Sequence, residues 1–173
     1  MNGNALWIAV AAAVLEFATT NARAEETETG PWYVNGALAA LTHVDGTDDY
    51  GVTGRIDGGY RFNRYFSAEV GYARVLDTDL QQAKIDGIEI AGRGEVPIND
   101  ALSAFARVGV LDWQRKFGRF DAGSGHDLTT GLGLRYAVSQ SFSLTGSFDY
   151  YNDVGLDSGD GTRQVNLGAQ LSF

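Results

Sequence analysis

Apolar and polar residues alternate over long stretches of this sequence, and the alternation keeps one phase to the last residue. It is clearest at the C-terminal end, where Val165, Leu167, Ala169, Leu171 and Phe173 are separated by polar residues and glycine. A period of two residues is typical of a β-strand with one apolar face and one polar face. The pattern therefore predicts strands that each expose two chemically different faces.

Eight such segments follow one another along the chain. The sequence has 173 residues, which suits one domain, and its 23 glycines and 2 prolines suit long strands joined by turns. The expected fold class is all-β, an eight-stranded antiparallel up-and-down β-barrel. We expect its strands at about 32–41, 51–62, 65–75, 85–96, 101–113, 127–137, 142–151 and 163–173.

The polar face of these strands carries five basic and five acidic residues. On a solvated face the charges need not balance, particularly in a chain with a net charge of −9. In a bilayer the apolar face turns to lipid and the polar face turns inward, where an unpaired charge is costly. The balance favours a transmembrane barrel with a lumen ion-pair network of Arg55, Asp57, Arg61, Glu69, Glu89, Arg93, Glu95, Arg107, Arg135 and Asp149.

Three short turns share one sequence pattern. Residues 63–67, 99–103 and 139–143 each have Asn or Ser first, an apolar residue fourth and Ser fifth, and they recur at intervals of 36 and 40 residues. Short turns are typical of the periplasmic end of a membrane barrel, and longer loops of its outer end. The longer polar connections are expected at 42–50, 76–84, 114–126 and 152–162.

The N-terminal segment has the pattern of an export signal. An apolar run of ten residues, Leu6 to Leu15, is followed by Ala22 and Ala24 in an A-x-A arrangement. This predicts a cleaved signal peptide at 1–24 and a barrel domain at 25–173. The alternative is a buried N-terminal helix. No later stretch is apolar for long enough to span a membrane as a helix, and alternation explains the mean hydropathy of only −0.16.

Composition excludes several classes of site. The chain has no cysteine, so disulfides, thiolate zinc sites and cysteine nucleophiles are absent. Its acidic excess argues against nucleic acid, because binding phosphates needs a basic face.

The end of the chain carries the most specific motif, Asn166-x-Gly168-x-x-Leu171-x-Phe173. With Gly58–Phe62 before a turn and Glu69–Tyr72 after it, this resembles the eight-stranded outer-membrane barrels, the family of the transmembrane domain of outer membrane protein A and of outer membrane protein X. The resemblance implies export through the periplasm and insertion into a Gram-negative outer membrane by the barrel-assembly machinery, with Asn166, Gly168, Leu171 and Phe173 as the assembly signal. Because the chain stops at the eighth strand, the peptidoglycan-binding domain of longer members is not expected.

Candidate catalytic and metal-binding residues are few. His43 and His126 are both expected in loops, without a second ligand at a metal spacing. Some barrels of this kind are lipid A-modifying enzymes, but His126 beside Ser124 does not match the expected signature. Acidic residues in the first and fourth outer loops lack the spacing of a calcium loop. We therefore expect no catalytic residues, no metal and no cofactor.

The third outer loop differs because it is basic. Arg115, Lys116 and Arg119 alternate with aromatic residues and could meet lipopolysaccharide phosphates, with a plain solvated loop as the alternative. Eight strands enclose an interior that side chains just fill. The expected function is structural or surface-interacting, as a monomer in contact with outer-membrane lipid and lipopolysaccharide. The alternatives are a narrow or gated channel and a soluble ligand-carrying barrel.

Overall fold

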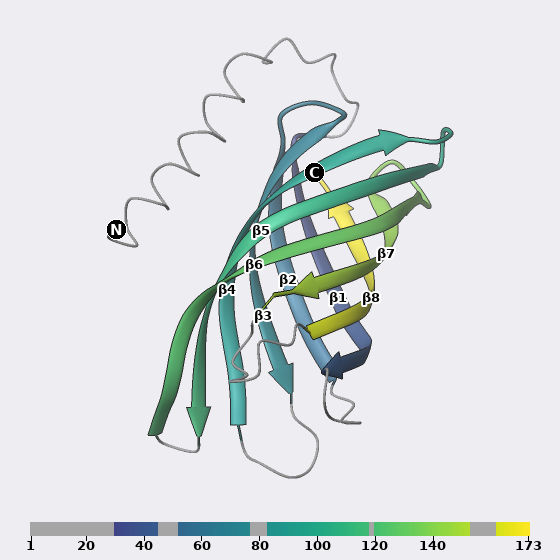
Figure 1. The fold of residues 1–173 in the computed structure, drawn as a ribbon. Coiled ribbons are helices and arrows are strands. Elements are labelled where there is room, and N and C mark those ends of the chain that lie inside the picture. The colour runs from purple at the N-terminus through teal and green to yellow at the C-terminus, as the bar shows by residue number, and fades with distance from the viewer. Residues whose placement is uncertain (1–29, 45–51, 77–82, 118–119, 153–161) are drawn as a thin grey trace.

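The chain forms a closed barrel of eight antiparallel strands (Figure 1). The computed structural model describes residues 30–44, 52–76, 83–117, 120–152 and 162–173. Each strand pairs with its neighbours in sequence, and the first strand also pairs with the last, so the sheet has no free edge. The predicted all-β barrel is confirmed. Its strands are β1 (Trp32–Val44), β2 (Val52–Arg61), β3 (Phe66–Leu76), β4 (Ala83–Pro97), β5 (Leu102–Phe117), β6 (Phe120–Ala137), β7 (Phe142–Tyr151) and β8 (Thr162–Ser172).

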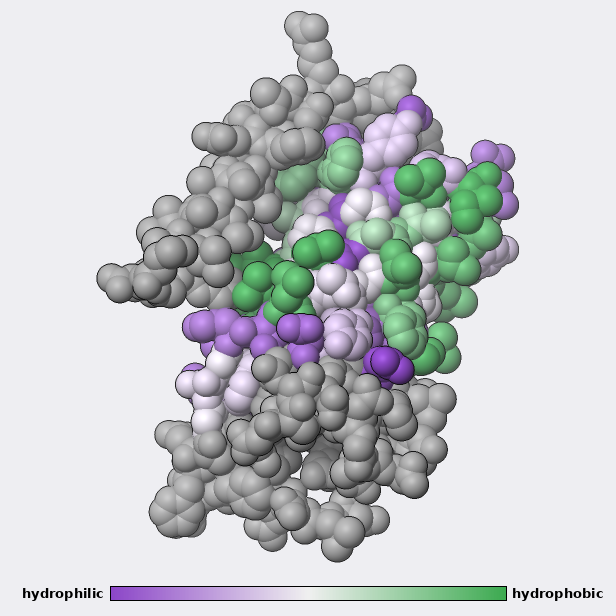
Figure 2. All heavy atoms as spheres, in the orientation of Figure 1, coloured by the Kyte–Doolittle hydropathy of each residue, from purple (hydrophilic) through white to green (hydrophobic). Residues whose placement is uncertain are grey.

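The two faces of the sheet have opposite chemistry. The outward side chains of Leu132 and Leu167 are 67% and 65% exposed, whereas the inward side chains of Asp57 and Glu89 are 2% and 1% exposed. Figure 2 shows apolar side chains gathered over the outside of the barrel. A soluble barrel would have the reverse arrangement, because its apolar residues would leave water for the interior. No helix within the described ranges is long and apolar enough to cross a bilayer.

The three short turns have one construction, which explains the repeated sequence pattern. Asn63 Oδ1 accepts hydrogen bonds from the backbone N–H groups of Tyr65 and Phe66, at 2.8 and 2.9 Å. Asn99 does the same two strands later, at 3.0 and 2.8 Å, and Ser139 Oγ accepts one bond from the N–H of Phe142 at 3.1 Å. The first residue of each pattern therefore closes its turn with its own side chain.

The hairpin of β5 and β6 is longer than expected. A polar loop was predicted at 114–126, but β5 continues to Phe117 and β6 begins at Phe120, with one register shift between Arg115 and Lys116. The prediction was wrong because residues 114–126 lack the alternation of apolar and polar side chains by which the other strands were identified. At the end opposite the C-terminus β4 accompanies the hairpin as far as Ala83, which pairs with Phe117, whereas β7 ends opposite Thr129 (Figure 1).

Candidate functional site

The candidate site is the barrel lumen, where the inward residues of all eight strands meet. Each of the ten charged residues predicted for the lumen network has a buried or half-buried side chain. Nine of them are joined through arginine–carboxylate ion pairs into one continuous network: Arg55, Asp57, Glu69, Glu89, Arg93, Glu95, Arg107, Arg135 and Asp149.

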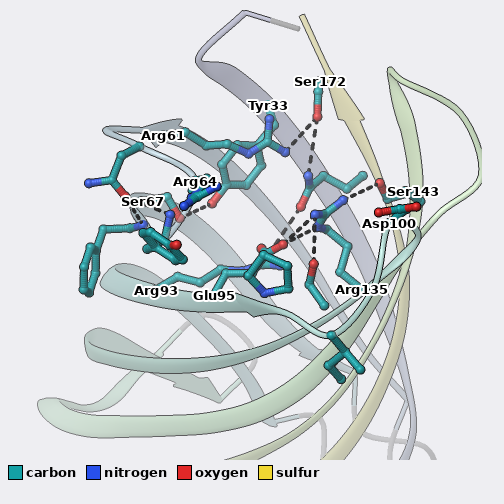
Figure 3. A pocket seen from close by; sticks show the side chains of 18 of the residues that line it. Tyr33, Arg61, Arg64, Ser67, Arg93, Glu95, Asp100, Arg135, Ser143 and Ser172 are labelled. Atoms are coloured by element: carbon teal, nitrogen blue, oxygen red, sulfur yellow. Dashed lines mark hydrogen bonds and ion pairs between the residues drawn. The ribbon is translucent and has the colours of Figure 1, made fainter. Parts of the chain in front are cut away.

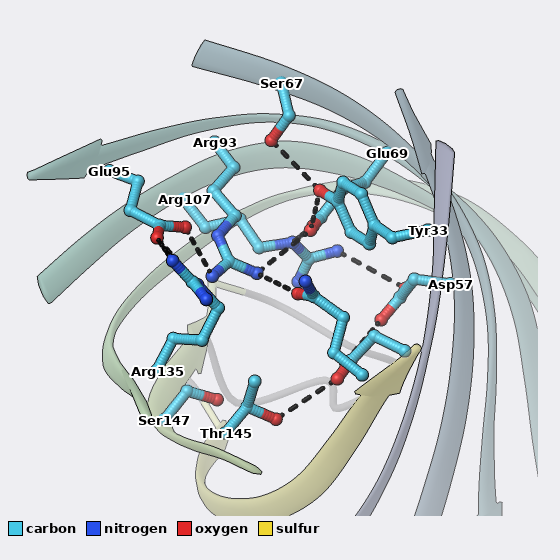
Figure 4. A network of polar contacts seen from close by, with 12 residues as sticks. Tyr33, Asp57, Ser67, Glu69, Arg93, Glu95, Arg107, Arg135, Thr145 and Ser147 are labelled. Carbon is cyan, nitrogen blue, oxygen red and sulfur yellow. Dashed lines mark hydrogen bonds and ion pairs between the residues drawn. The ribbon is translucent and has the colours of Figure 1, made fainter. Parts of the chain in front are cut away.

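Arg107 of β5 occupies the middle of the network (Figure 4). Its Nε donates to Glu69 Oε2 at 2.8 Å, and its Nη2 lies 2.9 Å from Glu89 Oε2. Arg55 lies between Asp57, at 2.7 Å, and Glu89, at 3.4 Å. Carboxylates from three strands thus share two arginines. Sharing of this kind compensates the loss of water around each charge.

From the middle of the lumen the network continues through Arg93 toward the turn end, which is the end of the barrel that carries the three short turns. Arg93 Nη1 lies 3.4 Å from Glu69 Oε1, and its Nη2 donates to Glu95 Oε2 at 2.9 Å. Glu95 also accepts a hydrogen bond from Arg135 Nε at 2.7 Å. The guanidinium of Arg93 lies 3.8 Å from the centre of the Phe105 ring, which fixes its position by a cation–π contact.

Arg61, the tenth predicted residue, stands outside the ion pairs. No carboxylate of the described residues lies within ion-pair distance of it. Its Nη2 donates to Ser172 Oγ at 2.9 Å, and its guanidinium lies 4.8 Å from the centre of the Tyr33 ring. The lumen therefore has one arginine whose charge is held in place by neutral groups.

Neutral polar residues fill the rest of the interior, and none of those described in this paragraph was among the ten residues predicted for the lumen. Tyr33 donates to Glu69 Oε1 at 2.7 Å and accepts from the Ser67 hydroxyl at 2.9 Å, and Thr129 donates to Glu89. Each of these residues lies at an inward position of its strand, so the alternation of the sequence could have identified it. Charge counting misses such residues because it ignores hydroxyl groups.

Inward glycines make room for the larger side chains. Gly59 pairs with Tyr33, and a Cβ on Gly59 would lie 2.1 Å from that ring. Gly133 stands in the same relation to Phe105, with 2.3 Å to the ring. These glycines let an aromatic ring lie flat against the neighbouring strand, so the lumen closes without a break in the sheet.

The free space in the lumen is unequal along the barrel. The cavity inside the network has a volume of about 20 Å³, which holds no more than a water molecule. At the turn end a cavity of about 480 Å³ is lined by residues of all three short turns and by inward side chains of the strands (Figure 3). The lumen is therefore open at the turn end and closed in the middle by the network. We call the cavity at the turn end the cup.

The four residues of the predicted assembly signal split between the faces of β8. Leu171 and Phe173 point outward and are exposed. Asn166 is buried and donates to Asp149 Oδ2 at 2.8 Å, while a Cβ on Gly168 would lie 2.6 Å from the backbone oxygen of Gly36. Asn166 and Gly168 therefore also pack the finished barrel.

The remaining candidate residues lie at the loop end. Both histidines were expected in loops but lie in strands, His43 in β1 and His126 in β6, because these strands extend further than predicted. Arg115 and Lys116 belong to β5, and Arg119 lies outside the described residues. Within the described ranges no group of three or more His, Asp or Glu side chains is arranged to hold a metal ion.

A closed sheet with a lipid-compatible exterior and a charged, filled interior defines the class of transmembrane β-barrels. The sequence profile of the outer membrane protein β-barrel domain matches residues 9–173, and the chain belongs to this family. The predicted family, and with it a location in the Gram-negative outer membrane, is thereby confirmed.

Related sequences and solved structures support the same family. Outer membrane protein A of Yersinia pseudotuberculosis is 29% identical over 92% of this chain, which spans about half (51%) of that relative's length. Neisserial surface protein A has the same fold, with a TM-score of 0.69, 18% identity and coverage of 84% of this chain and 99% of its own. The attachment invasion locus protein Ail of Yersinia pestis, solved with the heparin analogue sucrose octasulfate, gives a TM-score of 0.57 at 19% identity, over 82% of this chain and 96% of its own.

Proposed function

We propose that this chain is a structural, surface-interacting barrel of the outer membrane whose lumen is closed by its own side chains. The observation that carries the proposal is the network in the middle of the lumen, where nine charged residues leave a cavity of only about 20 Å³. A hydrated ion needs a continuous water-filled path, and the network occupies that path.

Single-channel recording in planar lipid bilayers tests the closed lumen. We expect no conductance steps from the wild type. The double variant Glu69→Ala, Arg107→Ala empties the middle of the network and should conduct, which shows that the assay detects an open lumen. A wild type that conducts as well as this variant would favour the alternative, a narrow channel.

The extended β5–β6 hairpin is the proposed surface-interacting part. It extends beyond β7, Arg115 and Lys116 lie near its tip, and Arg119 follows in the connection between the two strands. Arginine pairs well with phosphate, so lipopolysaccharide phosphates are the proposed contact. The anionic ligand of the Ail structure is in keeping with this proposal.

Lipopolysaccharide binding is tested by replacing Arg115, Lys116 and Arg119 with Gln and measuring co-sedimentation with lipopolysaccharide vesicles. Weaker binding is expected, with a steep dependence on salt for the wild type. Arg163→Gln removes one exposed arginine of β8 outside this hairpin; it is the control and should bind as the wild type does. Unchanged binding by the triple variant would remove this hairpin as the contact.

Export and assembly belong to the same proposal. Residues 1–24 act as the signal peptide, and the barrel-assembly machinery recognises the signal that ends at Phe173. The protein works as a monomer and without catalysis. The names of the relatives are those of outer membrane and surface proteins. Unchanged lipid A, by mass spectrometry of membranes with and without the protein, is the expected result.

A further inference from the structure

The cup at the turn end has a wall of hydrogen-bond donors. The fifth residue of each repeated turn pattern, Ser67, Ser103 or Ser143, lines this cavity, and Ser139 and Ser172 add two further serine hydroxyls. Arg135 reaches two of them, with Nη1 at 3.2 Å from Ser143 Oγ and Nη2 at 3.3 Å from Ser103 Oγ. The recurring serine thus has a position of its own, which closing the turn does not require.

Basic side chains outnumber acidic ones around the cup. Among the residues that the structure describes, its lining includes four arginines, Arg61, Arg64, Arg93 and Arg135, and two carboxylates, Glu95 and Asp100. Glu95 is shared by Arg93 and Arg135, with oxygens at 2.9 and 2.6 Å from their nitrogens. The lining therefore has an excess of two positive charges, in a chain whose net charge is −9. Such a concave patch concentrates anions.

The guanidinium of Arg61 is available to bind an anion. Tyr33 and Ser172 hold its guanidinium in place, and neither neutralises its charge. Figure 3 shows Arg61, Arg135 and Ser172 around the same space. A guanidinium fixed in this way loses little freedom when an oxyanion binds, and its planar fork suits two oxygens.

We propose that the cup is a binding site for a small dianionic solute with carboxylate or phosphate oxygens. Its volume of about 480 Å³ lies within the usual range for small-molecule pockets. The closed network beneath it makes the site a receptor that faces the periplasm, and the solute does not pass through the barrel.

The test uses the refolded chain from Glu25 to Phe173 in lipid nanodiscs. Inorganic phosphate and succinate are titrated separately while NMR follows the amides of Ser67, Ser103 and Ser143 and the Nε–H of Arg61. Saturable shifts are expected. Arg61→Gln should weaken binding about tenfold or more, because a charge-assisted hydrogen bond is lost. Arg163→Gln removes the same charge at the loop end and should leave binding unchanged.

Shifts that do not saturate, or that respond equally to Arg61→Gln and Arg163→Gln, would overturn the proposal. Heat-dependent gel mobility verifies that each variant is folded.

Discussion

Replacing Arg107 by Gln removes the side chain that joins Glu69 and Glu89 in the middle of the lumen. Breaking a buried ion pair by removing one partner costs about 3–5 kcal/mol. Both carboxylates keep other partners, since Tyr33 donates to Glu69 at 2.7 Å and Arg55 lies 3.4 Å from Glu89. The loss of unfolding free energy should therefore lie near the lower limit, about 3 kcal/mol.

A double-mutant cycle measures this coupling directly. The single variants Arg107→Gln and Glu69→Gln and the double variant are unfolded in urea from lipid vesicles and followed by tryptophan fluorescence. The double variant should lose less than the sum of the single ones, with a coupling of about 1–3 kcal/mol. Arg163→Gln, at the exposed loop end of β8, is the control for loss of an arginine outside the lumen. Additivity within about 0.5 kcal/mol would refute the network as a stabilising unit.

Three further variants test the faces of the sheet. Gly59→Ala forces a methyl group into the Tyr33 ring and should cost about 1–3 kcal/mol, whereas Gly58→Ala, whose Cβ has no atom within 4 Å, should be nearly neutral in the same urea assay. Leu132→Arg on the lipid face should cost about 2–4 kcal/mol, against about 0–1 kcal/mol for Val138→Arg at the turn end. Phe173→Ala should lower the fraction of chains inserted in the outer membrane, measured by heat-dependent gel mobility after fractionation. Equal insertion would exclude Phe173 from the assembly signal.

The barrel could be predicted from sequence because a strand between lipid and a polar lumen must alternate apolar and polar residues. In a membrane barrel the outward positions of a strand are apolar or aromatic, and Leu132, Leu134 and Tyr136 of β6 follow this rule in sequence and in space. Toward the tip of the β5–β6 hairpin the alternation stops. The small and polar residues at 121–126 were therefore indistinguishable from those of a loop.

The sequence predicted which charged residues face the lumen, but it did not predict which of them form ion pairs with one another. The inward phase and the charge count identified Arg55 and Arg107, yet which carboxylates they share depends on strand register and on side-chain length. Asp57 lies 2.7 Å from Arg55 and 3.8 Å from Arg107, a difference that no spacing in the sequence encodes. The cup escaped prediction for the same reason, because its serines and arginines come from different strands and meet only when the barrel closes.

The distribution of charge follows from the same physics. Removing the five arginines and five carboxylates of the lumen from the 13 basic and 22 acidic residues leaves 8 and 17, so the whole net charge of −9 belongs to the rest of the chain. Water and salt screen that excess in the loops and terminal segments, whereas the interior of the barrel has no such screening and must balance its own charge. Within the lumen the two signs of charge are unevenly distributed along the barrel. In the middle, two arginines face four carboxylates, whereas at the turn end Arg61, Arg93 and Arg135 face Glu95. Arg93 lies 3.4 Å from Glu69 and joins the two groups, so the positive excess of the cup is balanced in part by the carboxylates beneath it and in part by the water to which the cup opens.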